Sequence, residues 1–227
     1  MYPEIATAYV GRSKLEVLMG PRIWDQVRGK SVLDFGCGHG VEAIEMAERG
    51  ARRVIGVDLN EPWLVGARQQ AIERGVADRC IFVNQTREHV DAILCLDAFE
   101  HFADPAGILS AMSEQLNEGG KVLVSFGPTW YHPLGGHLFS VFPWSHLLVA
   151  ESALIKWRSM YKTDGAKTIE ETGLNRMTIA RFRGLVAQSP LRFESCETVP
   201  IRRLRRLHNA LTREFTTATV RCTLVHR

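Results

Sequence analysis

The chain has 227 residues, a formal net charge of +3, a hydrophobic fraction of 45% and a charged fraction of 23%. This length and balance are ordinary for a soluble globular protein with a substantial core, and the mild charge does not by itself indicate a nucleic-acid partner. No apolar run reaches the length of a membrane span, and the N-terminus lacks the pattern of a signal peptide, so we expect no membrane partner.

The cysteines indicate the redox environment. They are odd in number, scattered and without a C-x-x-C pair, at positions 37, 80, 95, 196 and 222. Most fall in or beside expected strands or a glycine-rich loop. Reduced, mostly buried thiols in a cytoplasmic protein fit this pattern best.

The first 30 residues have apolar side chains at helical spacing. Gly20 and Pro21 interrupt the pattern, which predicts two helical pieces rather than one. Packing against the rest of the chain is the expected role of most of these side chains.

Residues 31–40, SVLDFGCGHG, combine a short β-prone run with three glycines. A periodic apolar pattern follows from Val41, so the segment predicts a strand, a tight turn and a helix of residues 41–49. Glycines are needed where a backbone bends sharply and approaches a ligand closely. The turn also presents free N–H groups at a helix N-terminus, which suit a carboxylate or a phosphate.

Several readings of this loop compete. A nicotinamide-binding turn requires G-x-G-x-x-G, but position 41 is Val, and no G-K-[ST] follows as a P-loop requires. A plain glycine-rich turn is also consistent with this stretch alone. The order Asp34-x-Gly36-x-Gly38-x-Gly40 resembles motif I of the class I S-adenosylmethionine-dependent methyltransferases, in which an acid ends the strand before the glycines. Such an acid suits the ammonium group of that cofactor.

Asp58 ends the next expected strand, residues 53–59, about twenty residues beyond the loop. An acid there can accept hydrogen bonds from both ribose hydroxyls. It can also cap the helix expected over residues 61–74, and the two roles do not exclude each other. After the third strand, residues 80–83, the family's adenine-facing acid is replaced by Asn84-Gln85, either of which can offer a side-chain carbonyl.

The fourth strand, residues 90–96, ends in Asp97-Ala-Phe-Glu100-His101, with Asp104-Pro105 beyond it. A helix of residues 106–116, a turn at 117–120 and a fifth strand at 121–126 follow. Repeated strand–helix–strand order predicts a doubly wound, Rossmann-like sheet with its ligand at the carboxyl ends of the strands. We expect seven strands, mostly parallel, and the family resemblance implies that the last one is antiparallel.

Residues 128–175 are rich in glycine, proline, aromatic residues and histidine, and we interpret them as a lid or substrate insertion with a helix over 147–157. A helix of residues 178–188 and strands at 191–198 and 216–227 complete a single domain of residues 1–227. Between these strands IRRLRRL, residues 201–207, carries four arginines. It is a solvated helix face or an anion-binding patch.

The family resemblance implies specific functional residues. It implies S-adenosylmethionine as cofactor and an N-terminal helical cover, residues 1–30. The implied cofactor contacts are Asp34, Gly36, Cys37, Gly38, Gly40, Asp58, Leu59, Asn84, Leu96 and Asp97.

The acid-x-x-Glu-His segment suggests the chemistry. It resembles a segment of metal-dependent small-RNA 2′-O-methyltransferases and of ubiquinone-type O-methyltransferases. If residues 99–102 begin a helical turn, Asp97, Glu100 and His101 share one face and, with His137 or its rival His132, suit a divalent metal ion. Without a metal, His101 is the candidate general base.

These observations predict a methyltransferase that acts on an oxygen of a small-molecule acceptor, with Glu100, His101 and His137 as catalytic candidates and a metal ion as an open question. An RNA 2′-O-methyltransferase and a non-catalytic cofactor-binding domain are the alternatives. The mild charge and the lack of a separate RNA-binding domain count against RNA.

Overall fold

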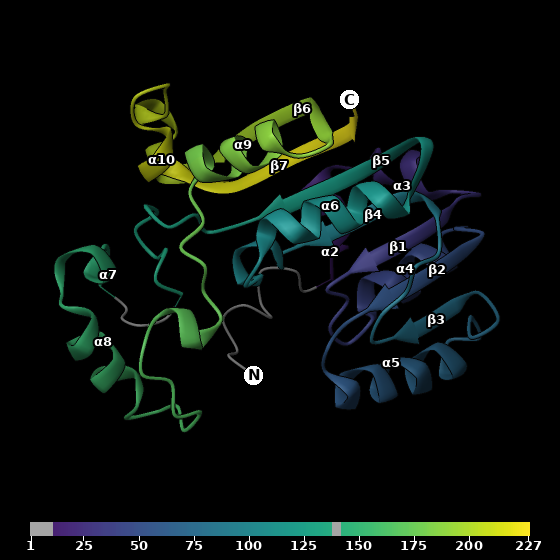
Figure 1. Ribbon diagram of the computed structural model, residues 1–227, viewed down its shortest axis with the longest axis horizontal. Helices are drawn as coiled ribbons and strands as arrows, with labels where there is room; N and C mark the ends of the chain where they lie inside the picture. Colours follow the sequence, from purple (N-terminus) through teal and green to yellow (C-terminus); the bar gives the residue numbers. More distant parts are fainter. Residues whose placement is uncertain (1–10, 138–141) are drawn as a thin grey trace. The chain divides into compact units, whose positions relative to one another are not determined.

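The computed structural model describes residues 11–137 and 142–227, and its secondary structure follows a repeated strand–helix order (Figure 1). The sequence fragments expected as strands form one seven-stranded sheet in the order β3-β2-β1-β4-β5-β7-β6, so the Rossmann-like prediction is confirmed. The first strands are β1 (Ser31–Phe35), β2 (Arg53–Val57), β3 (Cys80–Val83) and β4 (Val90–Leu96), and β1 pairs in parallel with both β2 and β4. The remaining strands are β5 (Leu116–Phe126), β6 (Leu191–Pro200) and β7 (Thr217–His226), and β7 runs antiparallel to β5.

Helices occupy most of the connections. The expected N-terminal pieces are α2 (Lys14–Met19) and α3 (Ile23–Val27), while residues 1–10 of the predicted cover lie outside the described part of the chain. Next come α4 (Val41–Glu48), α5 (Glu61–Glu73), η1 (Phe99–His101) and α6 (Pro105–Gln115). The later helices are α7 (Ser145–Leu148), α8 (Glu151–Arg158), η2 (Glu170–Thr172), α9 (Ile179–Gln188), η3 (Arg202–Leu207) and α10 (Arg213–Thr216).

The described part of the chain divides into two compact units. The first contains residues 11–96, 112–123 and 223–226, and the second contains residues 97–111, 124–137, 142–222 and 227. In the first unit α4 and α5 pack on β2 and β3, and the apolar faces of all four elements join one core. Phe82 is central to it, because a Cβ added at Gly40 or Gly56 would lie only 2.5 or 2.6 Å from its ring.

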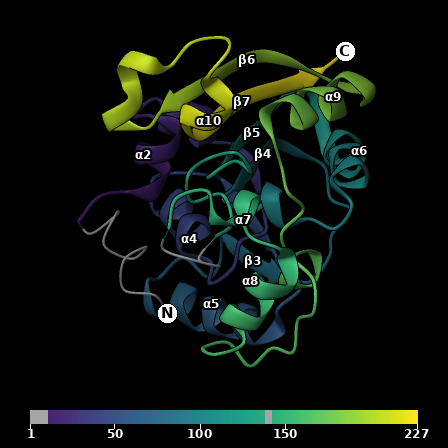
Figure 2. The ribbon, with the colours of Figure 1, turned by 90° about the vertical axis from the view of Figure 1, so that its left-hand side faces the viewer.

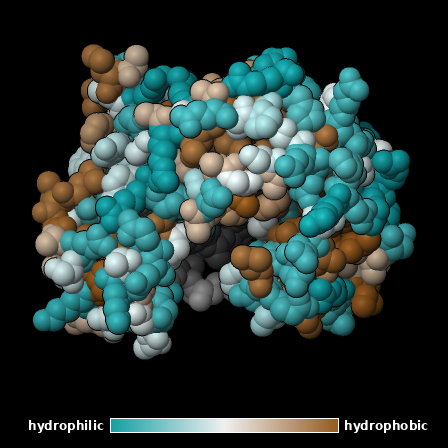
Figure 3. All heavy atoms as spheres, in the orientation of Figure 1, coloured by the Kyte–Doolittle hydropathy of each residue, from teal (hydrophilic) through white to brown (hydrophobic). Residues whose placement is uncertain are grey.

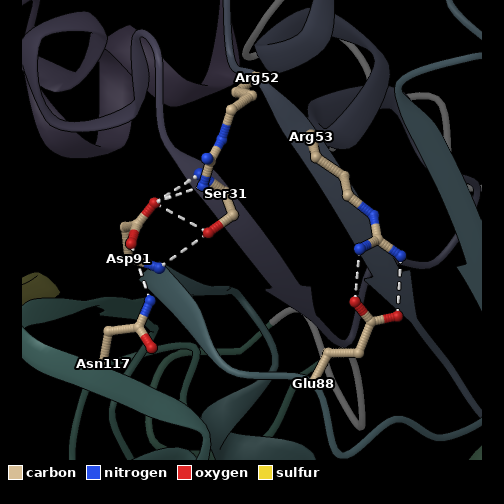
Figure 4. A network of polar contacts seen from close by, with 6 residues as sticks. All are labelled: Ser31, Arg52, Arg53, Glu88, Asp91 and Asn117. Carbon is tan, nitrogen blue, oxygen red and sulfur yellow. Dashed lines mark hydrogen bonds and ion pairs between the residues drawn. The ribbon is translucent and has the colours of Figure 1, made fainter.

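A polar network fastens the N-terminal ends of three strands in the first unit (Figure 4). Asp91 of β4 accepts hydrogen bonds from the backbone and hydroxyl of Ser31 in β1 at 2.9 and 2.8 Å, and from the side-chain amide of Asn117 in β5 at 2.8 Å. These bonds, the backbone one first, lower the pKa of Asp91 below its usual value. Asn117 belongs to β5, which begins at Leu116, so the predicted turn at 117–120 is wrong.

A hollow of about 440 Å³ lies at this edge of the sheet, and Ser31, Arg53 and Asn117 are among the residues that line it. The predicted cofactor residues follow the opposite, C-terminal ends of the strands.

The segment of residues 128–175 has a small core of its own in the second unit. Leu154, Ile169 and Leu174 are buried together, and Trp130 packs against them. The helix predicted over 147–157 is instead two, because Val149 is extended between α7 and α8. Arg176 fastens the segment through ion pairs to Glu151 and Glu170 at 2.7 and 2.9 Å. The role of this segment as a lid stays a prediction.

All five cysteines are free thiols, and four of them are buried. Within residues 11–137 and 142–227, no helix combines the length and apolar character that crossing a bilayer would require.

Candidate functional site

The glycine loop, residues 34–40, joins β1 to α4 in the first unit. Its backbone adopts positive φ angles at Gly36, Gly38 and Gly40, of 83, 52 and 74°, which only glycine adopts without strain. The amides of Gly36 and Cys37 both donate to the carbonyl of Val57, at 2.8 and 3.0 Å, so the turn is bonded to the end of β2. The loop is therefore shaped by hydrogen bonds of its own backbone and by its glycines.

The glycines differ in what surrounds them. A Cβ at Gly40 would collide with Phe82 and Ala67, so this glycine serves packing. A Cβ at Gly38 would meet no described protein atom within 4 Å, so the backbone there faces open space. Open space above a loop of bare backbone is what close approach of a ligand needs.

Asp34 is a buried acid at the end of β1. Its exposed fraction is 3%, and its Oδ2 atom has no hydrogen-bond partner among the described residues. Burial, and then the neighbouring charge of Glu42, raise its pKa to about 8, although Lys14 acts in the opposite direction. A buried carboxyl with an unpartnered oxygen is costly unless a cationic group pairs with it, so this site fits the ammonium group of an amino-acid ligand.

Asp58 follows β2 and bonds back to the glycine loop. Its Oδ2 atom accepts from the Gly38 amide at 2.9 Å, and its Oδ1 atom accepts from the Asn60 amide at 2.9 Å. The N-cap of α5 is Asn60, whose side chain accepts from the Trp63 amide, so the reading of Asp58 as that cap is wrong. A carboxylate has about four acceptor positions, which leaves room for ribose hydroxyls beside these two bonds.

The other predicted cofactor residues lie at the strand ends. Leu59 is 91% exposed after β2, Asn84 is exposed after β3, and Leu96 is buried as the last residue of β4. A contact that the sequence did not reveal is the tilted packing of His39, in the loop, on Trp63 of α5, with ring centroids 4.9 Å apart. Trp63 belongs to no recognisable motif. Its position three residues after the N-cap Asn60 is the one sequence feature that could have indicated its place beside the loop.

In the second unit the acid-x-x-Glu-His segment forms a short 3₁₀ turn rather than an α-helical face. Asp97 lies before η1 with a φ of 50°, outside the helix. Glu100 is 3% exposed, and its Oε1 atom accepts from the Gly127 amide at 3.2 Å. His101 is exposed, and its Nδ1 atom lies 2.9 Å from the carbonyl of Gly173. The shared face expected for Asp97, Glu100 and His101 is therefore not formed.

His137, and not its rival His132, lies against His101. The two rings are T-shaped with centroids 5.4 Å apart, and the His137 Nε2 atom lies 3.2 Å from the carbonyl of Pro128. Burial lowers the pKa of His137 to about 4, and burial followed by the nearby His146 lowers the pKa of His132 to about 4. Both rings are consequently neutral at physiological pH.

The backbone carbonyls fix which ring nitrogens carry protons. A carbonyl only accepts hydrogen bonds, so His101 carries a proton on Nδ1, and in the neutral form of the ring the lone pair is on Nε2. By the same reasoning His137 is protonated at Nε2. His101 thus presents an unprotonated nitrogen that is held in one orientation, as a general base requires.

Asn175 holds the turn that carries His101. Its side-chain amide donates to the carbonyls of Phe99 and Phe102, both at 2.9 Å, and its backbone amide donates to the carbonyl of Glu100 at 3.0 Å. The carbonyl of Gly173, two residues earlier, bonds to His101, so the segment of residues 173–175 makes four hydrogen bonds to the turn. Sequence reasoning missed Asn175, since no motif relates it to a segment more than seventy residues away.

The metal-ligand arrangement is not present in the described part of the chain. No group of three or more histidine, cysteine, aspartate or glutamate side chains there is placed to hold a metal ion. The predicted ligands are directed to other partners, Glu100 to a backbone amide and His137 to a backbone carbonyl. The residues present do not fit the predicted metal site.

Comparison with known proteins gives a consistent set of relatives. A family model described as "Methyltransferase domain" matches residues 13–177. A protein of Idiomarina loihiensis named ubiquinone biosynthesis O-methyltransferase is 32% identical over 175 residues, which are 71% of this chain and 70% of that protein. Proteins of the same name from Neisseria meningitidis and Pseudomonas aeruginosa are 35% and 41% identical, over 66% and 43% of this chain. The chain spans only 62% and 44% of the lengths of these two relatives.

Solved structures agree on the fold. The magnesium protoporphyrin IX methyltransferase of Synechocystis with bound S-adenosylhomocysteine superposes with a TM-score of 0.59 at 18% identity, over 93% of this chain and 80% of that one. An S-adenosylmethionine-dependent methyltransferase of Mesorhizobium loti gives a TM-score of 0.60 at 19% identity, over 89% and 93%. At these identities the likeness concerns the fold alone.

Proposed function

Because the chain belongs to the class I S-adenosylmethionine-dependent methyltransferases, we propose that it transfers a methyl group to an oxygen atom of a small-molecule acceptor. The observation that carries the choice of oxygen is the hydrogen bond from His101 Nδ1 to the Gly173 carbonyl, which orients the ring and leaves Nε2 available as a base. A hydroxyl is a weak nucleophile at neutral pH and gains from a base, whereas an amine gains less. The names of the curated relatives support the same choice.

The residues of the first unit fit the cofactor. Asp34 would pair with the α-ammonium group, because its buried Oδ2 atom has no other partner among the described residues. Asp58 would accept the ribose hydroxyls, Asn84 would face the adenine, and the open backbone at Gly38 would lie against the amino-acid tail. When bound, S-adenosylmethionine supplies a methyl group made electrophilic by a positively charged sulfur.

His101 then removes the proton of the acceptor. Its Nε2 atom takes the hydroxyl proton as the oxygen attacks, and the Gly173 carbonyl stabilises the imidazolium that forms by keeping its bond to Nδ1–H. His137, neutral at physiological pH, packs against this ring and restricts its rotation. Glu100 acts on the backbone, by fixing the amide of Gly127, rather than on the acceptor.

The reaction proceeds without a metal ion in this proposal, because no three of the predicted ligands are grouped to hold one in the described part of the chain, and Glu100 and His137 each bond to the backbone. Full turnover after treatment with a chelator is the expected result. Loss of turnover that added Mg²⁺ or Zn²⁺ restores would contradict it and return Asp97, Glu100, His101 and His137 to the role of ligands.

The function is tested by incubating the purified chain with S-adenosylmethionine and a panel of phenols and alcohols, with matched amines as controls. We expect S-adenosylhomocysteine to form with hydroxyl acceptors. Transfer confined to the amines would overturn the choice of oxygen. A calorimetric titration that detects no affinity for S-adenosylhomocysteine would overturn the cofactor assignment itself.

A further inference from the structure

The connection between β6 and β7, residues 201–216, displays cationic and apolar side chains together. Figures 1 and 2 place it, with η3 and α10, at one end of the β6–β7 hairpin, and Figure 3 shows hydrophobic side chains reaching the surface there, at the upper left. Leu207 is 59% exposed and Leu211 is 90% exposed. The exposed side chains of interest, called here the basic–apolar patch, are Arg202, Arg203, Arg205, Arg206, Leu207, Leu211 and Phe215.

The positive charge of the patch is not neutralised within the described chain. None of the four arginines has a recorded ion pair with a described residue. The acid of the connection, Glu214, accepts hydrogen bonds from the amides of Ile179 and Ala180 at 3.1 and 2.8 Å, so its charge serves the N-terminus of α9. The patch therefore keeps a net positive potential toward the solvent.

The connection is ordered by its own hydrogen bonds. The ring of His208 bridges the hydroxyls of Thr198 and Thr216, at 3.0 and 2.8 Å. The side chain of Asn209 accepts from the amides of Leu211 and Thr212 at 2.9 and 3.2 Å. A connection held this way keeps Leu207 and Leu211 exposed to water, so the protein gains no stability from burying these large apolar side chains. Exposed leucines on an ordered connection indicate a surface that contacts another molecule or a membrane.

We propose that the basic–apolar patch docks the protein on an anionic phospholipid surface. Arginines attract anionic headgroups, and exposed leucines beside them enter the boundary with the acyl chains, the combination typical of peripheral membrane contacts. A nucleic acid would engage the arginines, but it offers no apolar phase to the leucines. The lack of a spanning segment, from which the sequence predicts no membrane partner, does not bear on peripheral contact of this kind.

The ring of Phe215 links the patch to the segment of residues 128–175. It lies against Tyr131 with centroids 5.3 Å apart. A surface that binds the patch would therefore lie next to the segment of residues 128–175, which we expect to border the acceptor. The proposal stands independently of the methyl acceptor, because it rests on charge and exposure alone.

The test is co-sedimentation of the full chain with vesicles. Vesicles of equal parts phosphatidylcholine and phosphatidylglycerol are compared with vesicles of phosphatidylcholine alone. We expect binding only to the anionic vesicles, weakened by salt. Each arginine is expected to contribute roughly fivefold to the affinity for anionic vesicles. A quadruple variant with Gln at positions 202, 203, 205 and 206 is therefore expected to bind more than about a hundredfold less tightly. The matched control replaces four exposed arginines elsewhere, Arg22, Arg28, Arg87 and Arg192, by Gln and keeps most of the affinity.

A second variant tests the apolar part. Leu207→Ser with Leu211→Ser leaves the charge unchanged and is expected to weaken vesicle binding by about tenfold or more, with an unchanged melting temperature because both side chains are exposed. Equal losses in the patch and control quartets, equal binding to neutral vesicles, or an unaffected leucine variant would overturn the proposal. So would binding of a single-stranded RNA oligonucleotide, lost in the patch quartet, without binding to anionic vesicles.

Discussion

The glycine loop and the region of His101 are built in different ways. The loop, with Asp58, takes its shape from backbone bonds between adjacent strand ends and from glycines whose φ angles are positive. The turn of His101 is shaped by side chains and carbonyls that arrive from residues 173–175, more than seventy positions along the chain. The contrast teaches that the proposed cofactor site is a local property of the sequence, whereas the proposed base depends on long-range assembly.

The largest expected effect is on the free energy of unfolding, and it differs between two glycines of the same loop. Gly40→Val places a side chain against Phe82 and Ala67 at a positive φ, so we expect a loss of about 3 kcal/mol or more in the free energy of unfolding. At Gly38 an added Cβ meets no described protein atom within 4 Å, so we expect Gly38→Val to cost mainly the backbone strain, about 1–2 kcal/mol. Denaturant unfolding measures both.

Calorimetry completes the comparison, because folded Gly38→Val is expected to show no measurable binding of S-adenosylhomocysteine. Normal binding by this variant would contradict the assignment of the open backbone to the cofactor.

The next effect concerns His101. His101→Ala removes the proposed base, so kcat is expected to fall by roughly 10²–10⁴-fold. The affinity for S-adenosylhomocysteine is expected to be unchanged, because the ring is exposed and belongs to the second unit. If the variant instead unfolds, or binds the cofactor product poorly, His101 is structural. His226→Ala, a histidine bonded to the Ser113 carbonyl in the first unit, is the matched control and is expected to retain turnover.

Asp34 makes cofactor binding depend on pH. Its pKa of about 8 means that the free protein holds a proton there at neutral pH, and an ammonium ligand favours the ionised form. Binding therefore releases a proton, so affinity for S-adenosylhomocysteine is expected to rise by up to about tenfold per pH unit as the pH approaches about 8, and to level off above it. The cofactor-free chain loses stability over the same interval, because its folded state binds the proton more tightly than its unfolded state.

The control for this pH dependence is a second carboxylate. Asp34→Asn is expected to flatten the profile and weaken binding, while Asp58→Asn weakens binding and keeps the slope. An unchanged slope in Asp34→Asn would assign the proton to another group.

The smallest effect tests the long-range assembly. Asn175→Ala removes two side-chain hydrogen bonds to the turn of His101, each contributing about 1 kcal/mol, and leaves the backbone bond to Glu100 in place. We expect kcat to fall by about tenfold, with an altered pH profile and normal cofactor affinity. A proportional loss of stability and activity, with an unaltered pH profile, would show a merely structural role.

The same contrast explains what the sequence could predict. The seven strands and the strand–turn–helix at the glycine loop follow from patterns that span fewer than thirty residues, and the structure confirms them, whereas the order of the strands in the sheet comes from the structure alone. A shared face of Asp97, Glu100 and His101 requires a helical turn that includes all three, but the 3₁₀ turn covers only residues 99–101 and Asp97 lies before it with a left-handed φ. Neither the Gly127 amide that takes up Glu100 nor Asn175 is marked by spacing, since both depend on how distant segments meet.

Phe82 constrains which residues can occupy two distant positions of the chain during evolution. Its ring lies where a Cβ would stand at both Gly40 and Gly56, one in the glycine loop and one in β2. Among homologues, alanine at position 56 is expected together with a smaller residue at position 82, and alanine at position 40 together with smaller residues at both 82 and 67, so these positions are expected to covary.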